Sequence, residues 1–143
     1  MSFIWKLWGF EFVVAISDEE YPLFEEINRY AKVNLKHFII SSIKDLINIF
    51  SSANLVLCND SSAAHIAVGV GVKSICISNG NHYRRFIPYP FYLNTKQVVV
   101  LPESLKNMSE YQTEKLYFKS EIDINDVSIE EVYKSCCLVL DEN

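Results

Sequence analysis

The stretch NDSSAAHIAVGVGVKSICIS, residues 59–78, decides the fold class of this chain. It follows the apolar run LVLC at residues 55–58, passes through small residues suited to a helix over 61–70, and ends in the apolar run SICIS at 74–78. Gly71 stands where that helix should end, because glycine readily adopts the left-handed backbone conformation of a helix C-terminus. A strand, a helix and a second strand in close succession predict a β–α–β unit with parallel strands.

The same alternation extends in both directions along the chain. Further apolar runs at 10–17, 37–40 and 97–101 predict strands, and helical patterns begin after Ser17 and Ser41. Strands that are apolar on both faces and separated by helices are typical of an α/β fold, here a Rossmann-like parallel sheet flanked by helices with right-handed crossovers.

The expected organisation is a single domain over residues 1–143. Residues 79–127 are loop-rich, with a short helix in the polar part from 102 onward, and a helix at 128–140 closes the chain. Ser128 and Glu131 predict a capping box at the start of that closing helix.

Composition and charge exclude several classes of function. The formal net charge of −5 over 143 residues disfavours nucleic-acid binding. No apolar run is long enough to span a bilayer, and Glu11 interrupts the apolar opening, so neither a transmembrane segment nor an export signal is expected. The cysteines and histidines lack metal-ligand spacing, which predicts free thiols in a reducing cytoplasm and no metal site. These residues are Cys58, Cys76, Cys136 and Cys137, and His37, His65 and His82.

Polar side chains gather where the strand at 54–60 meets the following helix. Asp60, Ser61 and Ser62 lie at the carboxyl end of the strand, which is where open α/β sheets bind ligands. The N-terminus of the next helix offers unpaired N–H groups and partial positive charge, which suit a diphosphate, and His65 lies one turn further on. An ionised Asp60 can accept hydrogen bonds from sugar hydroxyls. The same residues also suit an ordinary helix cap, and His65 also suits a partly buried structural histidine.

This stretch resembles the motif D-T/S-G/S-x-x-H-x-A-x-x-x-G of glycosyltransferase family 9, which includes the lipopolysaccharide heptosyltransferases. The residues before this stretch, SSIKDLINIFSSANLVLCND, are similar to those that precede the motif in the family. The residues after it, GNHYRRFIPYP, resemble the G-x-H-x-x-R-F-x-P-Y loop of one branch. The similarity runs continuously over about residues 38–90, and SIEEVYKS resembles the family's closing helix. The loop residues that fit are Gly80, His82, Arg85, Phe86, Pro88 and Tyr89.

The resemblance implies a GT-B enzyme in which this chain is the C-terminal, donor-binding half. Asp60 would contact the donor sugar, Ser61 and Ser62 the diphosphate, and His65 the departing phosphate. Gly80, His82 and Arg85 would belong to a donor loop. The substrate would be a nucleotide-diphosphate sugar, and no metal or other cofactor is implied.

The resemblance further implies transfer of a sugar such as heptose, with inversion, to a lipopolysaccharide or other bacterial surface glycan. The acceptor and the general base would belong to an N-terminal domain or a partner chain, so no catalytic residue is expected among these residues. The implied location is the cytoplasm, with peripheral association at the inner membrane.

The sequence also departs from the family pattern. Ser62 replaces a frequent Gly, which narrows the room for a phosphate, and Asn81 and Arg84 stand where the branch tends to have Gly. Arg84 suits a solvated side chain better than a phosphate contact, and the first strand of the donor half and its Lys-bearing loop have no counterpart. Two alternatives therefore stay open, a non-catalytic nucleotide-binding or interaction module and an inactive truncated remnant.

Overall fold

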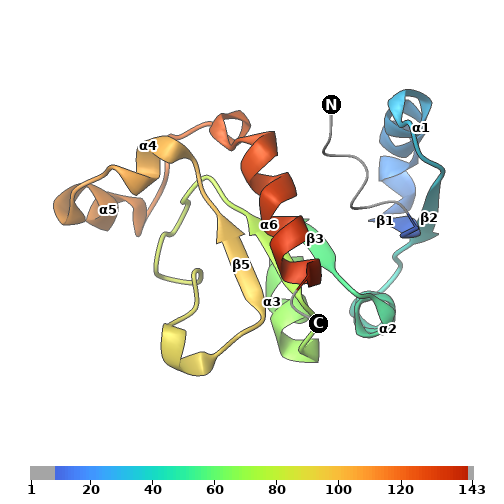
Figure 1. Ribbon diagram of the computed structural model, residues 1–143, viewed down its shortest axis with the longest axis horizontal. Helices are drawn as coiled ribbons and strands as arrows, with labels where there is room; N and C mark the ends of the chain where they lie inside the picture. The colour runs from blue at the N-terminus through green and yellow to red at the C-terminus, as the bar shows by residue number, and fades with distance from the viewer. Residues whose placement is uncertain (1–8, 142–143) are drawn as a thin grey trace. The chain divides into compact units, whose positions relative to one another are not determined.

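A computed structural model describes residues 9–141 and divides the chain into two compact units, one up to Ile49 and one from Phe50 onward (Figure 1). The boundary lies within helix α2, Ile43–Ser52. All strand pairings within the described residues are parallel, and helices flank the strands, which confirms the predicted α/β class. The assignment of residues 1–143 to a single domain stays a prediction.

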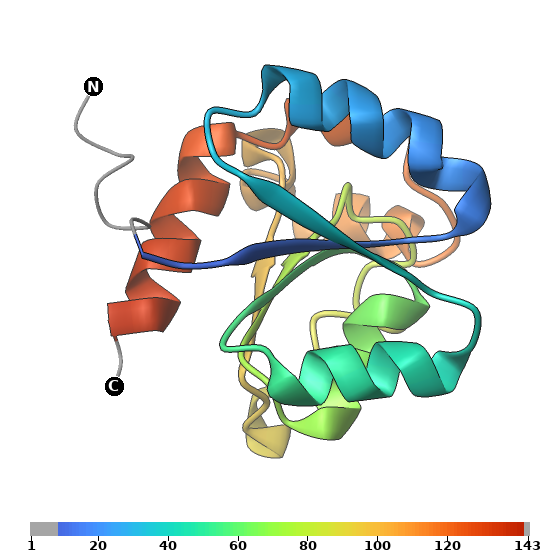
Figure 2. The ribbon, with the colours of Figure 1, turned by 90° about the vertical axis from the view of Figure 1, so that its right-hand side faces the viewer.

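The first unit contains a parallel strand pair and one long helix. Strands β1, Phe12–Ile16, and β2, Leu35–Ile39, pair with Phe12 opposite Leu35. Between them come a 3-10 turn, η2, Asp18–Glu20, and helix α1, Tyr21–Tyr30, which lies along one side of the strand pair (Figure 2). Ser17 caps the turn as predicted, because its N–H and its hydroxyl both donate to the Glu20 carboxylate, at 2.7 and 2.9 Å.

The second unit contains a three-stranded parallel sheet in the order β3–β4–β5. Its strands are β3, Val56–Asn59, β4, Ser74–Ile77, and β5, Gln97–Val100, and helix α3, Ser62–Val70, connects the first two. Helix α3 starts at Ser61 and ends at Gly71, whose φ of 74° is the left-handed conformation predicted for that position.

Neighbouring residues of β4 supply the two faces of this sheet. Ile75 packs into a cluster beneath the closing helix α6, Ile129–Asp141, while Cys76 packs against Ala64 of α3 on the opposite face (Figure 1). Both side chains are fully buried. Successive side chains of a strand alternate between faces, so a strand covered on both faces favours apolar residues at consecutive positions, as at Ile75, Cys76 and Ile77. The buried Ser74 has a polar partner, because its hydroxyl oxygen lies 3.4 Å from the Gln97 amide nitrogen.

The cysteines are free thiols, as predicted. Cys58 and Cys76 stand opposite each other in the β3–β4 register, and a hydrogen bond between the two thiols lowers the pKa of Cys58. The same hydrogen bond, together with burial, raises the pKa of Cys76. The predicted positions of the other two, Cys136 and Cys137, on the closing helix are also confirmed.

The region after β5 is more helical than the sequence predicted. The single short helix expected after residue 102 is two helices, α4, Glu103–Lys106, and α5, Glu110–Leu116, followed by a 3-10 turn at Ile124–Asp126. Residues 81–95 form a loop as predicted, with one 3-10 turn, η3, at Phe91–Leu93. No helix in the described part of the chain is long and apolar enough to cross a membrane.

The predicted capping box at α6 is half correct. The Glu131 N–H donates to the Ser128 hydroxyl at 3.4 Å, but it is Glu130 that accepts from that hydroxyl, at 3.0 Å. The Glu131 carboxylate lies instead 3.4 Å from the Lys106 ammonium, because α4 packs close enough to offer an opposite charge.

Candidate functional site

The carboxyl ends of β3 and β4 bring Asp60 and Ser78 together. Asn59 stands opposite Ile77 in the register, so the next residues of both strands are neighbours. The Ser78 hydroxyl donates to Asp60 Oδ2 at 2.9 Å and accepts from the Gly80 N–H at 3.0 Å. Ser78 is buried, with 2% of its surface exposed, so it holds the Asp60 carboxylate in one orientation. Sequence reasoning missed Ser78, although its place directly after a neighbouring strand was a usable signal.

Ser61 and Ser62 lie at the N-terminus of α3, as predicted. The Ser61 hydroxyl accepts from the Ala63 N–H at 3.3 Å, and the Ser61 carbonyl accepts from the Ala64 N–H at 3.0 Å. Ser61 is therefore a helix cap, although its hydroxyl keeps a proton that can be donated to a ligand. Ser62 is exposed at the first helical position, and within residues 9–141 its N–H has no hydrogen-bond partner.

His65 is held by Tyr89, one of the loop residues that fit the family pattern. Its Nδ1 lies 2.6 Å from the hydroxyl oxygen of Tyr89, and both side chains are half-buried. Burial, together with the nearby Cys76, raises the pKa of Tyr89, so the phenol stays protonated at neutral pH. Its O–H can then donate to Nδ1 of a neutral imidazole, which leaves the ring proton on Nε2.

The loop that follows β4 is fixed by contacts with the segment after α5. Ser120 is buried; its hydroxyl donates to the Asn79 carbonyl at 2.8 Å and its N–H donates to Asn81 Oδ1 at 3.1 Å. The Asn79 side chain donates to the Ile122 carbonyl at 2.8 Å. Gly80 has a φ of 81°, and a Cβ atom there would lie 2.2 Å from Leu105 Cδ1. Tight packing therefore accounts for the glycine, and the donor contact predicted for it stays a prediction.

One aromatic ring links the predicted helix residue to the predicted loop residues. The Phe86 ring centroid lies 6.3 Å from that of His65 and 5.6 Å from that of His82, both in edge-on geometry. The Arg85 guanidinium lies over the same ring at 5.0 Å. The structure thus brings three of the predicted residues, His65, His82 and Arg85, around Phe86.

His82 and Arg85 also contact the chain on their other side. His82 has a φ of 55°, and its Nδ1 lies 3.2 Å from the Tyr117 carbonyl oxygen. The Arg85 guanidinium lies 5.7 Å from the centroid of the Tyr117 ring. Both residues therefore have structural partners, and their predicted donor-loop role stays a prediction.

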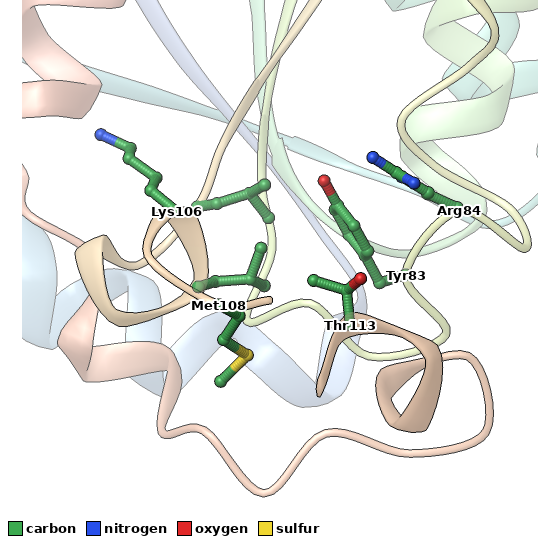
Figure 3. Close-up of a pocket in the computed structure, with 7 residues that line it drawn as sticks. Tyr83, Arg84, Lys106, Met108 and Thr113 are labelled. Carbon is green, nitrogen blue, oxygen red and sulfur yellow. The ribbon is translucent and has the colours of Figure 1, made fainter. Parts of the chain in front are cut away.

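The hollows of the second unit lie beside the predicted cluster and not within it. Two adjoining cavities, of about 270 and 220 Å³, share Tyr83, Arg84 and Thr113, and neither is lined by Asp60, Ser61, Ser62 or His65 (Figure 3). A ligand held at the end of β3 would therefore bind outside these two cavities.

Comparison with known proteins shows what this fold resembles. The chain is similar to a solved structure of glycosyl transferase family 9 from Veillonella parvula DSM 2008, with 18% sequence identity and a TM-score of 0.70. The alignment covers 98% of this chain and 39% of that chain, so the sequence spans about two fifths of the solved protein. No protein-family model matches the sequence. No curated protein matches it. The likeness confirms the predicted resemblance at the level of the fold.

Proposed function

We propose that this chain supplies the donor-binding half of a family 9-type glycosyltransferase that uses a nucleotide-diphosphate sugar. The observation that carries the proposal is the position of D-S-S-A-A-H: it joins β3 to α3 in a fold similar to a family 9 structure over 98% of this chain. Ligands of open α/β sheets bind at such strand ends, and the helix N-terminus adds partial positive charge for a diphosphate.

Each polar group of this cluster has a role that its geometry supports. Asp60, oriented by Ser78, accepts hydrogen bonds from hydroxyls of the donor sugar. The Ser61 and Ser62 hydroxyls and the Ser62 N–H donate to the diphosphate oxygens. His65, with Nδ1 bonded to Tyr89, presents its Nε2–H to the departing phosphate.

In the transfer step, the acceptor hydroxyl oxygen attacks the anomeric carbon of the sugar and its bond to the diphosphate oxygen breaks. The electron pair of the broken bond passes to that oxygen, and the hydroxyl proton passes to a general base. Fixed donors such as His65 and Ser62 favour the negative charge that develops on the leaving diphosphate. Attack from the opposite face inverts the anomeric configuration.

The remaining parts of the reaction lie beyond the residues named here. The solved relative is more than twice as long as the aligned region. The family resemblance implies that the base and the acceptor site belong to a facing domain. We propose that a second domain or a partner chain supplies both. The proposed acceptor is a bacterial surface glycan or lipopolysaccharide core and the proposed sugar a heptose, with transfer in the cytoplasm at the inner membrane and without a metal ion.

The donor-loop assignment extends the site across Phe86. Arg85 and His82 lie around the ring that also contacts His65, so a sugar or phosphate held by the helix N-terminus is within reach of a second set of donors. Gly80 shapes the turn that starts this loop and brings its N–H to Ser78.

Calorimetric titration with ADP, GDP and UDP tests the proposal. We expect one of the three to bind with a Kd between about 1 μM and 1 mM, because a diphosphate alone engages only part of the site. In Ser62→Asp a carboxylate at the helix N-terminus repels the diphosphate and should weaken binding at least about tenfold, although it favours the helix itself.

Ser104→Asp is the matched control. Ser104 is an exposed serine of α4 outside the proposed site, so the same change of charge should leave nucleotide binding within about twofold of the unchanged protein. Equal losses in both variants would mean that the diphosphate is not held at α3. Absence of binding to all three nucleotides would contradict a preformed donor site in this chain.

A further inference from the structure

The two adjoining cavities beside the loop after β4 form one hollow that is not lined by Asp60, Ser61, Ser62 or His65. The larger measures about 270 Å³ and lies between Tyr83 and Arg84 of the loop and the α4–α5 region, which contributes Lys106, Met108 and Thr113 (Figure 3). The smaller measures about 220 Å³ and continues past Tyr117 and Phe118. Sites for small organic ligands usually measure about 300–1,000 Å³, so this hollow suits a ligand nearer in size to a monosaccharide than to a nucleotide sugar.

Arg84 is the distinctive group of this hollow. Its backbone is held in the left-handed region, with φ of 61°, and its N–H donates to the Ile87 carbonyl at 2.9 Å. Its guanidinium carbon lies 5.4 Å from the centroid of the Tyr83 ring, so the charged group stays beside the aromatic wall of the cavity. Within residues 9–141, Arg84 forms no ion pair with a carboxylate.

Two other charged side chains line the hollow, Lys106 in the larger cavity and Glu114 in the smaller one. Lys106 lies 3.2 Å from Glu103 and 3.4 Å from Glu131, and these carboxylates raise the pKa of Lys106 and offset its charge. Glu114 lines only the smaller cavity. The larger cavity therefore combines Arg84, for which the described residues offer no ion pair, with apolar walls formed by Leu101, Leu105 and Met108.

We propose that the larger cavity binds a compact organic anion, with Arg84 on a phosphate or carboxylate group and the apolar body against Tyr83, Leu105 and Met108. A guanidinium matches both anions in geometry, and the adjoining apolar surface favours a ligand with a hydrophobic face over a bare ion. The cavity shares no lining residue with the cluster Asp60, Ser61, Ser62 and His65, so this proposal does not depend on the proposed function.

An NMR titration of the full chain tests this site. The probes are phenyl phosphate and benzoate, which carry the two anions on the same flat body, together with inorganic phosphate and phenol, which carry only one half of the proposed ligand. We expect one aromatic anion to shift the signals of Leu105, Met108 and Thr113 and to bind at least about tenfold more tightly than inorganic phosphate or phenol. Whichever of phenyl phosphate and benzoate binds more tightly shows whether the cavity prefers a phosphate or a carboxylate.

Two arginines, Arg84 and Arg29, supply a matched pair of variants. Arg84→Gln should weaken binding of the preferred probe at least about tenfold, because it removes the charged donor pair inside the cavity. Arg29→Gln makes the same change of charge at an exposed position of α1 that lines neither cavity, and it should change binding by less than about twofold. Arg84→Lys keeps the charge but lacks the planar guanidinium, so its affinity for the probe should lie between those of the unchanged protein and Arg84→Gln.

Several outcomes would overturn the proposal. Equal losses in Arg84→Gln and Arg29→Gln would show a general charge effect. Equal affinities for inorganic phosphate and phenyl phosphate would show that the apolar walls contribute nothing. Shifts confined to residues outside the cavity, or no saturable shift with either aromatic anion, would also contradict it. Because nucleotide binding at α3 is measured separately, failure here leaves that result unaffected.

Discussion

The Nδ1 atom of His65 and the hydroxyl oxygen of Tyr89 lie 2.6 Å apart, although the two residues are 24 positions apart in the chain. His65 belongs to helix α3, and Tyr89 belongs to the loop after β4 and packs against the buried cluster that includes Cys76 and Ile87. The orientation of the imidazole is therefore set by the loop as well as by its own helix. A substitution at Tyr89 should therefore change the NMR signals of the His65 ring.

Tyr89→Phe tests this relationship directly. The substitution removes the hydroxyl and keeps the ring, so the free energy of unfolding should fall by about 0.5–1.5 kcal/mol, the usual worth of one hydrogen bond. Nitrogen-15 NMR of the His65 ring should show an Nδ1 that accepts a hydrogen bond in the unchanged protein and loses it in the variant. Tyr92→Phe, on an exposed ring of the same loop, is the control and should leave both measurements unaltered. An unchanged His65 spectrum in Tyr89→Phe would contradict the contact.

Gly80→Ala should be strongly destabilising. The backbone at Gly80 has a φ of 81°, and the added Cβ would lie 2.2 Å from a methyl group of the buried Leu105. Left-handed backbone and overpacking together should lower the free energy of unfolding by about 2–4 kcal/mol. Chemical denaturation measures the change.

Gly69→Ala is the opposite case within the same unit. Gly69 lies in α3, and a Cβ there would meet nothing within 4 Å. Alanine in a helix loses less backbone freedom on folding than glycine does. The free energy of unfolding of this variant should therefore rise by about 0.5–1 kcal/mol. Similar effects of the two substitutions would show that the turn at Gly80 is not formed in solution.

Ser78→Ala removes the hydroxyl that lies between Asp60 and Gly80. The half-buried Asp60 carboxylate and the Gly80 N–H would both lose this partner, and unsatisfied groups of this kind cost up to about 1–3 kcal/mol when buried. Ser104→Ala, at an exposed position of α4, should alter the free energy of unfolding by less than about 0.5 kcal/mol. A loss in Ser78→Ala no larger than in the control would rule out the hydroxyl as a support of the site.

The Ser17–Glu20 cap should make the first unit sensitive to acid. Hydrogen bonds from the Ser17 N–H and then the Ser17 hydroxyl hold the pKa of Glu20 below its ordinary value of 4.5. The carboxylate therefore contributes stability that is present above pH 4.5 and is lost as the pH falls through the lowered pKa. A carboxyl carbon NMR titration between about pH 2 and pH 7 should give a midpoint below the ordinary value.

Variants at Ser17 separate the two causes of that shift. Ser17→Ala removes the hydroxyl and keeps the N–H, so the pKa of Glu20 should rise only part of the way to 4.5. Ser17→Thr keeps both donors and should leave the midpoint low. A midpoint of 4.5 in the unchanged protein would show that the cap does not form in solution.

The strands and helices of this fold could largely be predicted from the sequence. SICIS is apolar at positions that alternate between the two faces of a sheet, and Gly71 ends the preceding helix, so both elements follow from local residue properties. Strand β2 was predicted to begin at His37 but begins at Leu35, because pairing with β1 extends the strand through the charged Lys36 to Leu35. Pairing partners lie far apart in the sequence, so such boundaries are not local properties.

The candidate site was only partly predictable for the same reason. Asp60, Ser61 and His65 are adjacent in the sequence and were placed correctly at a strand end and a helix start. Ser78 could have been added, since parallel strands end side by side, but Tyr89 reaches His65 only through the path of an irregular loop. The cavity beside Arg84 depends on how α4 and α5 fold back beside that loop, which no local pattern indicates.

The contacts between the loop after β4 and the segment around Ser120 affect the order in which the chain can fold during translation. The Asn79–Ser120 and Asn79–Ile122 hydrogen bonds join residues 41 and 43 positions apart. A ribosome adds roughly 5–20 residues each second, so the loop emerges several seconds before its partners do. During that interval α3 and β4 can already be paired while Gly80 and its neighbours lack their supports. The loop after β4 therefore gains these supports only once the segment around Ser120 has emerged, and a chaperone present during translation would meet the loop before then.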